Sequence, residues 1–401
     1  MTEAVQAPEA AEILERVRGL APVFRERAAE SERLRRLPDE TIADAEAAGM
    51  FSLLLPRSLG GAGGGLREFV TLVRTLAQAD LSASWALGFL TAHNWLLARF
   101  PDEVQEEVFR DGAPGLMALV AHPTGKAVPV DGGYELTGHW RYCSGVMHAD
   151  WIVLTGAVEG REGVLFFLVP KDDAEVLDVW HMAGMQGTGS NDVRLDARFV
   201  PASRMVPFDN LFGRDTAGAR LHPEPIYGYD ARTLLTFFFP VMALGAAEGA
   251  IADYRQRLEQ RRAAFSATIV GDTVAGQMRY ARAVSELRMA QARLEQTVEL
   301  TIAANANEAA GDRAQGMSHE LRAAIKLDCM NICRTAWKAI EIALDGSGSS
   351  IYKQSDRTQH VVRDMHVLLS HMTIDEDGFL SRSGEILLGR ATDPDPTRDF
   401  I

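Results

Sequence analysis

The first part of the chain carries apolar residues at the spacing of amphipathic helices. Ile13 and Val17 belong to a helical pattern over residues 8–50, and a second helical pattern covers residues 66–110. Patterns of that length without strand-like alternation are typical of helical scaffold. We therefore predict an N-terminal helical domain over residues 1–115.

The pattern changes over residues 116–210 to short alternating or β-branched runs that are separated by turn residues. The expected strands include residues 126–130, 134–137, 151–155, 164–169 and 197–200. Between the first two runs, Asp131-Gly132-Gly133 predicts a hairpin turn. Residues 116–210 should therefore form a β domain.

Beyond Pro240 the chain is rich in alanine and helical in pattern almost to its end. The expected helices cover residues 241–264, 273–311, 317–345 and 357–374. Their lengths match an antiparallel bundle of long helices, which we place in a C-terminal domain over residues 211–401. The predicted fold class is α+β, mainly α, with a helical domain, a β domain and a helical bundle in that order.

Two features of the last domain bear on association and on access to a site. Alanine on several faces of long helices predicts packing against copies of the chain, as a homotetramer or a dimer of closed symmetry. The irregular segment 214–229 is either a mobile lid or a simple linker. Phe237, Phe238 and Phe239 follow it, and three consecutive aromatic residues cannot all face one side of a helix.

Composition narrows the class of protein. The chain has 401 residues and a formal net charge of −14, which argues against nucleic acid or an anionic membrane as a partner. The N-terminus lacks a basic and apolar leader, and no apolar run approaches the roughly 20 residues that span a bilayer, so we expect a cytoplasmic protein. Cys143, Cys329 and Cys333 show no ligand-pair pattern, which predicts reduced core thiols and no metal site.

The most informative stretch is GHWRYCSG, residues 138–145. Positions four apart on a strand point to the same face, so Trp140 and Ser144 can present a flat apolar wall and a hydroxyl to one ligand. That pairing suits a planar heterocycle with a polar edge, such as a flavin. The alternative is a tryptophan packed in a β core and a serine in the following turn.

Two loops offer further hydrogen-bonding groups. Thr188, Gly189 and Ser190 belong to a Gly-rich loop whose amides and hydroxyls can hold a phosphate or the polar edge of a ring. Ser347 and Ser349 lie in a Gly/Ser-rich break between helical patterns, which is either a plain linker or a ligand-facing loop.

His93 is another candidate for chemistry. It lies in an apolar helical stretch between Leu90 and Leu96. A histidine in that setting either has its hydrogen bonds satisfied in a core or faces a pocket, and the pattern leaves both open.

These features together resemble the acyl-CoA dehydrogenase superfamily over nearly the whole chain. Within it, the chain is similar to the flavin-dependent monooxygenase branch, the oxygenase components of two-component systems such as p-hydroxyphenylacetate hydroxylase. The matching positions are Pro56 with Gly60-Gly61, Pro123-x-Gly125-x-Ala127, Gly132-Gly133-Tyr134-x-Leu136-x-Gly138-x-Trp140-x-x-x-Ser144-Gly145, Ala149-Asp150-Trp151, Thr188-Gly189-Ser190-x-Asp192-Val193, and Arg363-Asp364 with His371. Their order and spacing carry the resemblance.

The resemblance implies a reaction and a partner. Reduced FAD or FMN, held without a covalent bond, would react with O2 to a C4a-hydroperoxide that hydroxylates a phenolic, indolic or polycyclic substrate. The same chemistry could oxidise nitrogen or sulfur, and those acceptors stay open. No nicotinamide-binding fingerprint occurs in the sequence, so an NAD(P)H-dependent flavin reductase would supply the reduced flavin.

The resemblance also implies roles for single residues. Ser144 would contact the N5 edge of the flavin and Trp140 would cover the ring. His93 would accept the proton of a phenol, because a neutral imidazole suits that task. His371 would hold the peroxide or donate its proton. Further flavin contacts would come from Thr188, Gly189, Ser190, Ser347 and Ser349, and the substrate pocket would include His122, Trp95 and Phe238.

Two other hypotheses remain. Acyl-CoA dehydrogenases use a glutamate that often follows an Arg-Asp pair, and here that position falls on Thr373, which cannot act as a base. An alignment slip of two or three residues would place Asp375, Glu376 or Asp377 there. The third hypothesis is a non-catalytic helical-bundle protein that has lost its flavin.

Overall fold

The computed structural model describes residues 9–109, 115–264, 266–312 and 315–391. Its contacts divide the chain into two compact units. Unit 1 comprises Met1–Leu72, Trp85–Met182 and Gln186–Thr233, and unit 2 comprises Val73–Ser84, Ala183–Met185 and Leu234–Ile401. The expected division into three domains stays a prediction.

The N-terminal helices follow the predicted apolar spacing. They are α1 (Ala10–Leu34), α2 (Asp39–Ala47), α3 (Leu66–Ala79), α4 (Leu81–Leu97) and α5 (Asp102–Val108). In α1 the buried positions include Ile13, Val17 and Phe24, which share one face. Helix α4 is apolar almost all round, which is typical of a buried helix.

Unit 1 contains a seven-stranded sheet with the order β5-β6-β2-β1-β3-β4-β7. The strands are β1 (Met117–Val130), β2 (Gly133–Cys143), β3 (Trp151–Val158), β4 (Leu165–Pro170), β5 (Glu175–Leu177), β6 (Asn191–Pro201) and β7 (Met205–Pro207). Strands β1 and β3 are parallel, and the other neighbours are antiparallel. The predicted hairpin is confirmed, because Val130 pairs with Gly133 and Gly132 has a positive φ of 77°.

The segment after the sheet, with α6 (Phe208–Phe212) and α7 (Ala217–Leu221), is held by a buried arginine. Arg99 has no exposed surface, and its guanidinium donates to the carbonyl oxygens of Leu211 at 2.7 Å and Tyr227 at 3.1 Å, and to that of Gly213. A Cβ at Gly218 would lie 2.3 Å from the carbonyl oxygen of Ala98. This packing favours a fixed linker over a mobile lid.

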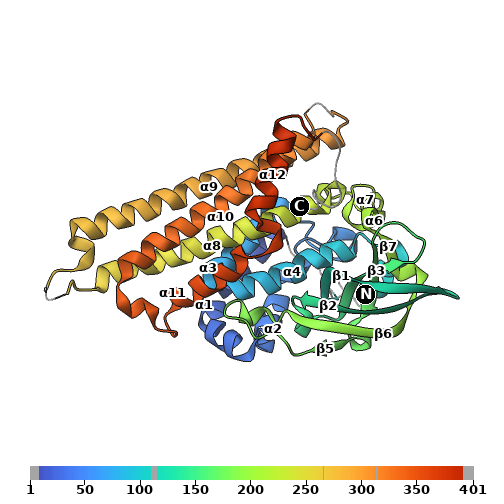
Figure 1. Cartoon of the computed structure of the whole chain (residues 1–401), viewed down its shortest axis with the longest axis horizontal. Coiled ribbons are helices and arrows are strands. Elements are labelled where there is room, and N and C mark those ends of the chain that lie inside the picture. Colours follow the sequence, from blue (N-terminus) through green and yellow to red (C-terminus); the bar gives the residue numbers. More distant parts are fainter. Residues whose placement is uncertain (1–8, 110–114, 265, 313–314, 392–401) are drawn as a thin grey trace, which may run out of the picture. The chain divides into compact units, whose positions relative to one another are not determined.

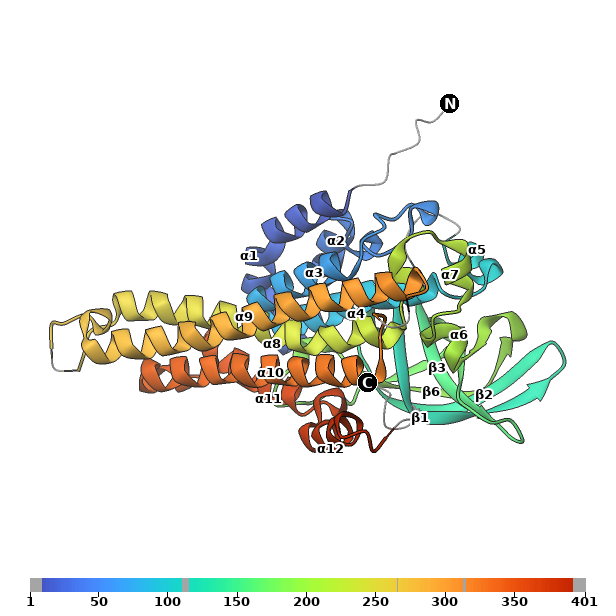
Figure 2. The same cartoon turned by 90° about the horizontal axis from the view of Figure 1, so that it is seen from above.

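Unit 2 is a bundle of long helices. It contains α8 (Ala231–Gln260) from Leu234 onwards, α9 (Val274–Ala309), α10 (His319–Ser347), α11 (Arg357–Leu369) and α12 (Glu376–Leu387). Figures 1 and 2 both show α9 and α10 side by side along their length. The predicted bundle is confirmed, but the last expected helix ends at Leu369, and the sequence analysis missed α12.

Helix α8 bears on the expectation that no apolar stretch of the chain is long enough to span a bilayer. Among the described residues it is the one helix that is long and apolar enough to cross a membrane, with a mean hydropathy of 1.7 over its most apolar window. The statement that no apolar run approaches that length was therefore wrong. Since 83% of that window is buried inside the protein, α8 has the character of a core helix. The three cysteines are free and buried, as predicted.

Within unit 2, two carboxylates flank one histidine. Asp80 precedes α4, and its Oδ2 accepts from the backbone N–H of Ala83 at 2.7 Å, while Asp364 accepts from the N–H of Met185 at 2.6 Å. His360 Nε2 lies 3.6 Å from Asp80 and 3.2 Å from Asp364. Burial raises the pKa of Asp80. Each carboxylate accepts a hydrogen bond from a backbone N–H, and His360 lies beside both. We therefore interpret the cluster as a structural contact that holds these backbone segments together.

The capping function of Asp80 predicts a specific stability pattern. Asp80→Ala should lower the free energy of unfolding by about 1–2 kcal/mol, because the N–H of Ala83 loses its acceptor. Asp80→Asn keeps an oxygen acceptor for that N–H, so it should cost less. Urea unfolding of both variants measures this, and equal losses would contradict the capping role.

Candidate active site

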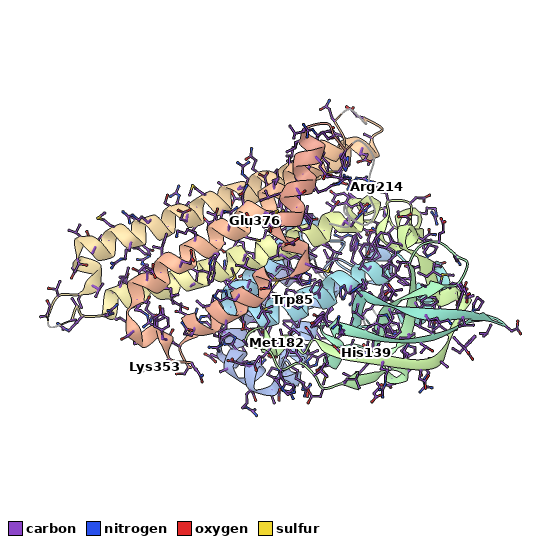
Figure 3. All side chains as sticks on the ribbon, in the orientation of Figure 1. Trp85, His139, Met182, Arg214, Lys353 and Glu376 are labelled. Atoms are coloured by element: carbon purple, nitrogen blue, oxygen red, sulfur yellow. The ribbon has the colours of Figure 1, made fainter. Side chains whose placement is uncertain are left out.

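One face of α4 carries three aromatic residues at successive helical turns. Trp85, Phe89 and His93 are spaced by four residues, so their side chains lie on the same side of the helix. The rings of Trp85 and Phe89 meet edge to face at 5.2 Å, and those of Phe89 and His93 stack at 5.1 Å. Trp85 is labelled in Figure 3. We call these residues the aromatic row.

The hydrogen bond of His93 fixes its tautomer. Its Nδ1 lies 3.1 Å from the carbonyl oxygen of Met117 at the start of β1. A carbonyl only accepts, so Nδ1 carries the proton and Nε2 is the acceptor nitrogen of the neutral ring. Burial lowers the pKa of His93 from 6.5 to about 4. The residue is therefore neutral near pH 7, with an in-plane lone pair at Nε2.

A chain of buried hydroxyl groups begins at Trp85. Its indole N–H donates to Ser144 Oγ at 2.8 Å, Ser144 Oγ lies 2.7 Å from Ser190 Oγ, and Ser190 Oγ lies 2.7 Å from Thr188 Oγ1. All four residues are buried. The sequence analysis proposed Ser144 from one stretch and Thr188 with Ser190 from another, and the structure brings these hydroxyl groups together. It missed Trp85, although the spacing of four residues on the His93 helix was a usable signal.

His371, in unit 2, has the opposite tautomer. Its Nδ1 lies 3.2 Å from the backbone nitrogen of Thr373, whose N–H donates to it. The neutral ring must then carry its proton at Nε2, which makes that nitrogen a donor. Burial lowers the pKa of His371 to about 4. Its ring stacks on Phe239 at 4.6 Å.

His371 also lines an open groove in unit 2 of about 880 Å³. The wall includes Trp337 and two basic residues, Arg334 and Lys338. Glu376, labelled in Figure 3, contributes to the same wall. The groove therefore places His371 among both charged and apolar side chains.

Comparisons with known proteins identify the family. The N-terminal domain of acyl-CoA dehydrogenase matches residues 7–111, and the C-terminal domain matches residues 237–376. A pigment production hydroxylase of Rhodococcus is 34% identical, covering 94% of this chain and 96% of that protein. The oxygenase subunit HsaA of the flavin-dependent monooxygenase of Rhodococcus jostii is 31% identical, covering 91% and 95%. The chain belongs to the flavin-dependent monooxygenases of the acyl-CoA dehydrogenase superfamily.

Further relatives agree with this assignment. The oxygenase component of an FADH2-dependent resorcinol hydroxylase from Rhizobium is 30% identical, covering 97% of this monooxygenase and 98% of that protein. The crystal structure of HsaA from M. tuberculosis superposes with a TM-score of 0.87 at 29% identity, covering 96% and 99%. XiaF from Streptomyces, in complex with FADH2 and glycerol, superposes with a TM-score of 0.86 at 27% identity, covering 96% and 97%. The monooxygenase is thus the oxygenase component of a two-component flavin system.

The hydroxyl chain has the donor and acceptor groups that the polar edge of a flavin requires. Trp85 and Ser190 are the contacts of Ser144 Oγ within the described residues, and a hydroxyl can make three hydrogen bonds. Ser144 therefore has one position left for a ligand. A reduced flavin fits these residues chemically.

Trp140 differs from the expectation that it covers a ring. Its indole is fully buried in the sheet core, and its N–H donates to the carbonyl oxygen of Thr155 at 2.9 Å. A Cβ at Gly125 would lie 2.3 Å from the indole, so glycine makes room for it. This arrangement favours the alternative of a core tryptophan. The exposed aromatic ring of the stretch is Tyr142, which lies 6.1 Å from Trp180.

The residues expected around the substrate do not all share a face. Trp95 is two positions from His93 on α4, so it points to another side, where Arg99 lies 4.8 Å above its ring. His122 is exposed where the register of β1 against β3 shifts. Phe238 is fully buried, and its neighbour Phe239 is the residue that contacts His371. Their pocket roles stay predictions.

The Gly/Ser-rich break ends α10. Ser347 is buried and its hydroxyl donates to the carbonyl oxygen of Ala343 at 2.6 Å, whereas Ser349 is exposed. Gly348 between them has a positive φ of 75°, which ends the helix. Of the two, Ser349 is accessible to a ligand.

The acids that a displaced dehydrogenase site would need have other partners. Asp375 caps α12, since its carboxylate accepts from the N–H of Gly378 at 3.2 Å. Glu376 forms an ion pair with Arg334. Thr373, at the position of the dehydrogenase glutamate, donates to His371. These contacts agree with the monooxygenase assignment.

Proposed function

We propose that this monooxygenase hydroxylates an aromatic substrate that carries a phenolic hydroxyl group. The reduced flavin is proposed to be FAD, because relatives of similar length are described as FADH2-dependent or bound to FADH2. A separate NAD(P)H-dependent flavin reductase would supply it. When bound, the reduced flavin activates O2 and supplies one oxygen atom to the substrate.

The observation that carries this proposal is the tautomer of His93. Its Nε2 is an acceptor because Nδ1 donates to Met117. A phenol that donates its O–H to Nε2 gains electron density in its ring, which favours attack by an electrophilic oxygen. A thioether or a tertiary amine has no proton to donate, so this histidine favours a phenol over those acceptors.

We propose that the other site residues bind the flavin or donate a proton. Ser144, with Ser190 and Thr188 behind it, would hold the polar edge of the flavin. Tyr142 would lie against the flavin in place of Trp140, because its ring is exposed. His371 would donate a proton from Nε2, since its Nδ1 is already an acceptor.

A product assay tests the proposal. Reduced FAD, O2 and the protein would be mixed with a phenol, with its methyl ether and with an aryl thioether of the same size. We expect a hydroxylated phenol and little product from the other two, because only the phenol can donate to His93. Equal oxygenation of the thioether would contradict the phenol assignment.

The lowered pKa of His93 predicts an unusual pH profile. The neutral ring is required, and with a pKa of about 4 it persists down to roughly that pH. Single-turnover hydroxylation should stay nearly constant from pH 8 to pH 5 and fall only below. A histidine with an unshifted pKa would be half protonated near pH 6.5, so the hydroxylation rate would fall to half at that pH. A fall centred at pH 6.5 would contradict this account.

Protein stability should also depend on pH through the buried histidines, which include His93 and His371. The unfolded chain binds the proton near pH 6.5, but the folded chain binds it only near pH 4. The contribution of the buried neutral ring is therefore complete above pH 6.5 and is lost as the pH falls toward 4. Stability measured in parallel separates this loss from the loss of activity.

A further inference from the structure

We propose that Trp85 is a positioning residue that orients the Ser144 hydroxyl toward the bound flavin. This inference rests on the proposed function, because it assigns Ser144 to the flavin edge. It adds a residue from α4 to the group of hydroxyls that Ser144, Ser190 and Thr188 form in the predicted β domain. The single observation behind it is the 2.8 Å hydrogen bond from the indole N–H to Ser144 Oγ.

The direction of that hydrogen bond restricts the serine. An indole N–H can only donate, so Ser144 must accept on that side. One lone pair, one proton and two partners remain, namely Ser190 and the ligand. If the ligand donates, Ser144 accepts from it and donates to Ser190. If the ligand accepts, Ser190 donates to Ser144 and Ser144 donates to the ligand.

Both settings satisfy every hydrogen-bonding position of Ser144, because Ser190 can donate or accept. Thr188 Oγ1 lies 2.7 Å from Ser190 Oγ, and either hydroxyl can be the donor. When the hydrogen bond between Ser144 and Ser190 reverses its direction, the hydrogen bond between Ser190 and Thr188 can therefore reverse as well. The nitrogen at the flavin edge changes between acceptor and donor when the flavin is oxidised or reduced. Ser144 can therefore bind both forms, and Trp85 keeps its oxygen in place for each.

The backbone around Ser144 shows why a hydrogen bond from Trp85 on α4 matters for the position of the serine hydroxyl. Ser144 follows a shift in the register of β2 against β6, between Trp140 and Cys143. Tyr142 has a positive φ of 65° and Gly145 has one of 78°, so the serine lies between two left-handed residues outside regular strand pairing. A regular strand does not fix its hydroxyl, whereas Trp85 extends from a buried helix and packs on Phe89.

A double-mutant cycle on flavin binding tests the proposal. Trp85→Phe removes the N–H and keeps an aromatic ring, and Ser144→Ala removes the acceptor. For oxidised FAD and for anaerobically reduced FAD, we expect Trp85→Phe to raise Kd about fivefold and Ser144→Ala about tenfold. The double variant should match Ser144→Ala within about twofold, because Trp85 acts through the serine. Both single variants should shift the visible absorption band of bound oxidised FAD in the same direction.

Trp151→Phe is the matched control. Trp151 belongs to the same unit as Trp85 but begins β3, where the guanidinium of Arg204 lies 5.0 Å from its ring. The same chemical change there should leave Kd and the FAD spectrum as in the wild type. This comparison removes the general effect of replacing an indole by a phenyl ring.

Three outcomes are distinct. Loss of the Trp85→Phe effect in the Ser144→Ala background, with the shared spectral shift, supports the proposal. An equal fivefold effect in both backgrounds, or no effect and no shift in either, overturns it while leaving the proposed function intact. Failure of the wild-type protein to bind FAD in either form would overturn the proposed function itself.

Discussion

Replacing His93 by Gln should lower the single-turnover rate of phenol hydroxylation by about a hundredfold or more. A general base typically contributes about 10²–10⁴ to a rate, and glutamine cannot take up a proton. Oxidation of reduced FAD by O2 should continue, with H2O2 released in place of the hydroxylated product. Rapid-quench product analysis beside an H2O2 assay measures both quantities.

His181→Gln is the control for this substitution. His181 is exposed and belongs to the same unit, so the same chemical change should leave hydroxylation within about twofold. A His93 variant that retained the wild-type product yield would contradict the proposed role of His93 as the base. A variant that lost FAD binding instead would show that His93 supports the cofactor.

Arg99→Met should reduce the free energy of unfolding by about 3 kcal/mol or more. The fully buried guanidinium donates to the carbonyl oxygens of Leu211, Gly213 and Tyr227. Methionine fills much of the volume but donates nothing, so these acceptors lose their partner, and each buried unsatisfied group costs about 1–3 kcal/mol. Burial lowers the pKa of Arg99 only to about 10, so it is charged at neutral pH.

Urea unfolding measures the total loss, and hydrogen exchange locates it. Amides of residues 211–229 should exchange faster in the variant, because Arg99 connects the two ends of that segment to the end of α4. Arg198→Met is the control, since Arg198 is exposed on β6 and its loss should change stability by less than about 0.5 kcal/mol. Equal losses for both arginines would contradict the proposal that Arg99 holds this segment in place.

Local sequence signals predicted most of the fold. The β1–β2 hairpin was predictable because a two-residue Asp-Gly turn specifies it, and the long helices because their apolar spacing is sustained. Strands β5 and β7 were missed because each is only three residues long and depends on a neighbour for its hydrogen bonds. Helix α12 was missed, although Asp375 caps its start.

The site was less predictable, because its contacts join distant parts of the chain. Trp85 and Ser144 are 59 positions apart, and no local pattern pairs them. Alternation along β2 predicted a shared face for Trp140 and Ser144, but the register shift leaves Arg141 and Tyr142 exposed in succession. The tautomers of His93 and His371 depend on backbone partners that only the folded chain supplies.

The most direct test of the central claim is stopped-flow absorbance without substrate. The protein with anaerobically reduced FAD would be mixed with oxygenated buffer, beside the same flavin without protein. An oxygenase component should delay the appearance of oxidised FAD well beyond the loss of reduced FAD, because its buried site protects the oxygen-reactive flavin from water. Reoxidation in one step at the rate of free flavin would contradict the account.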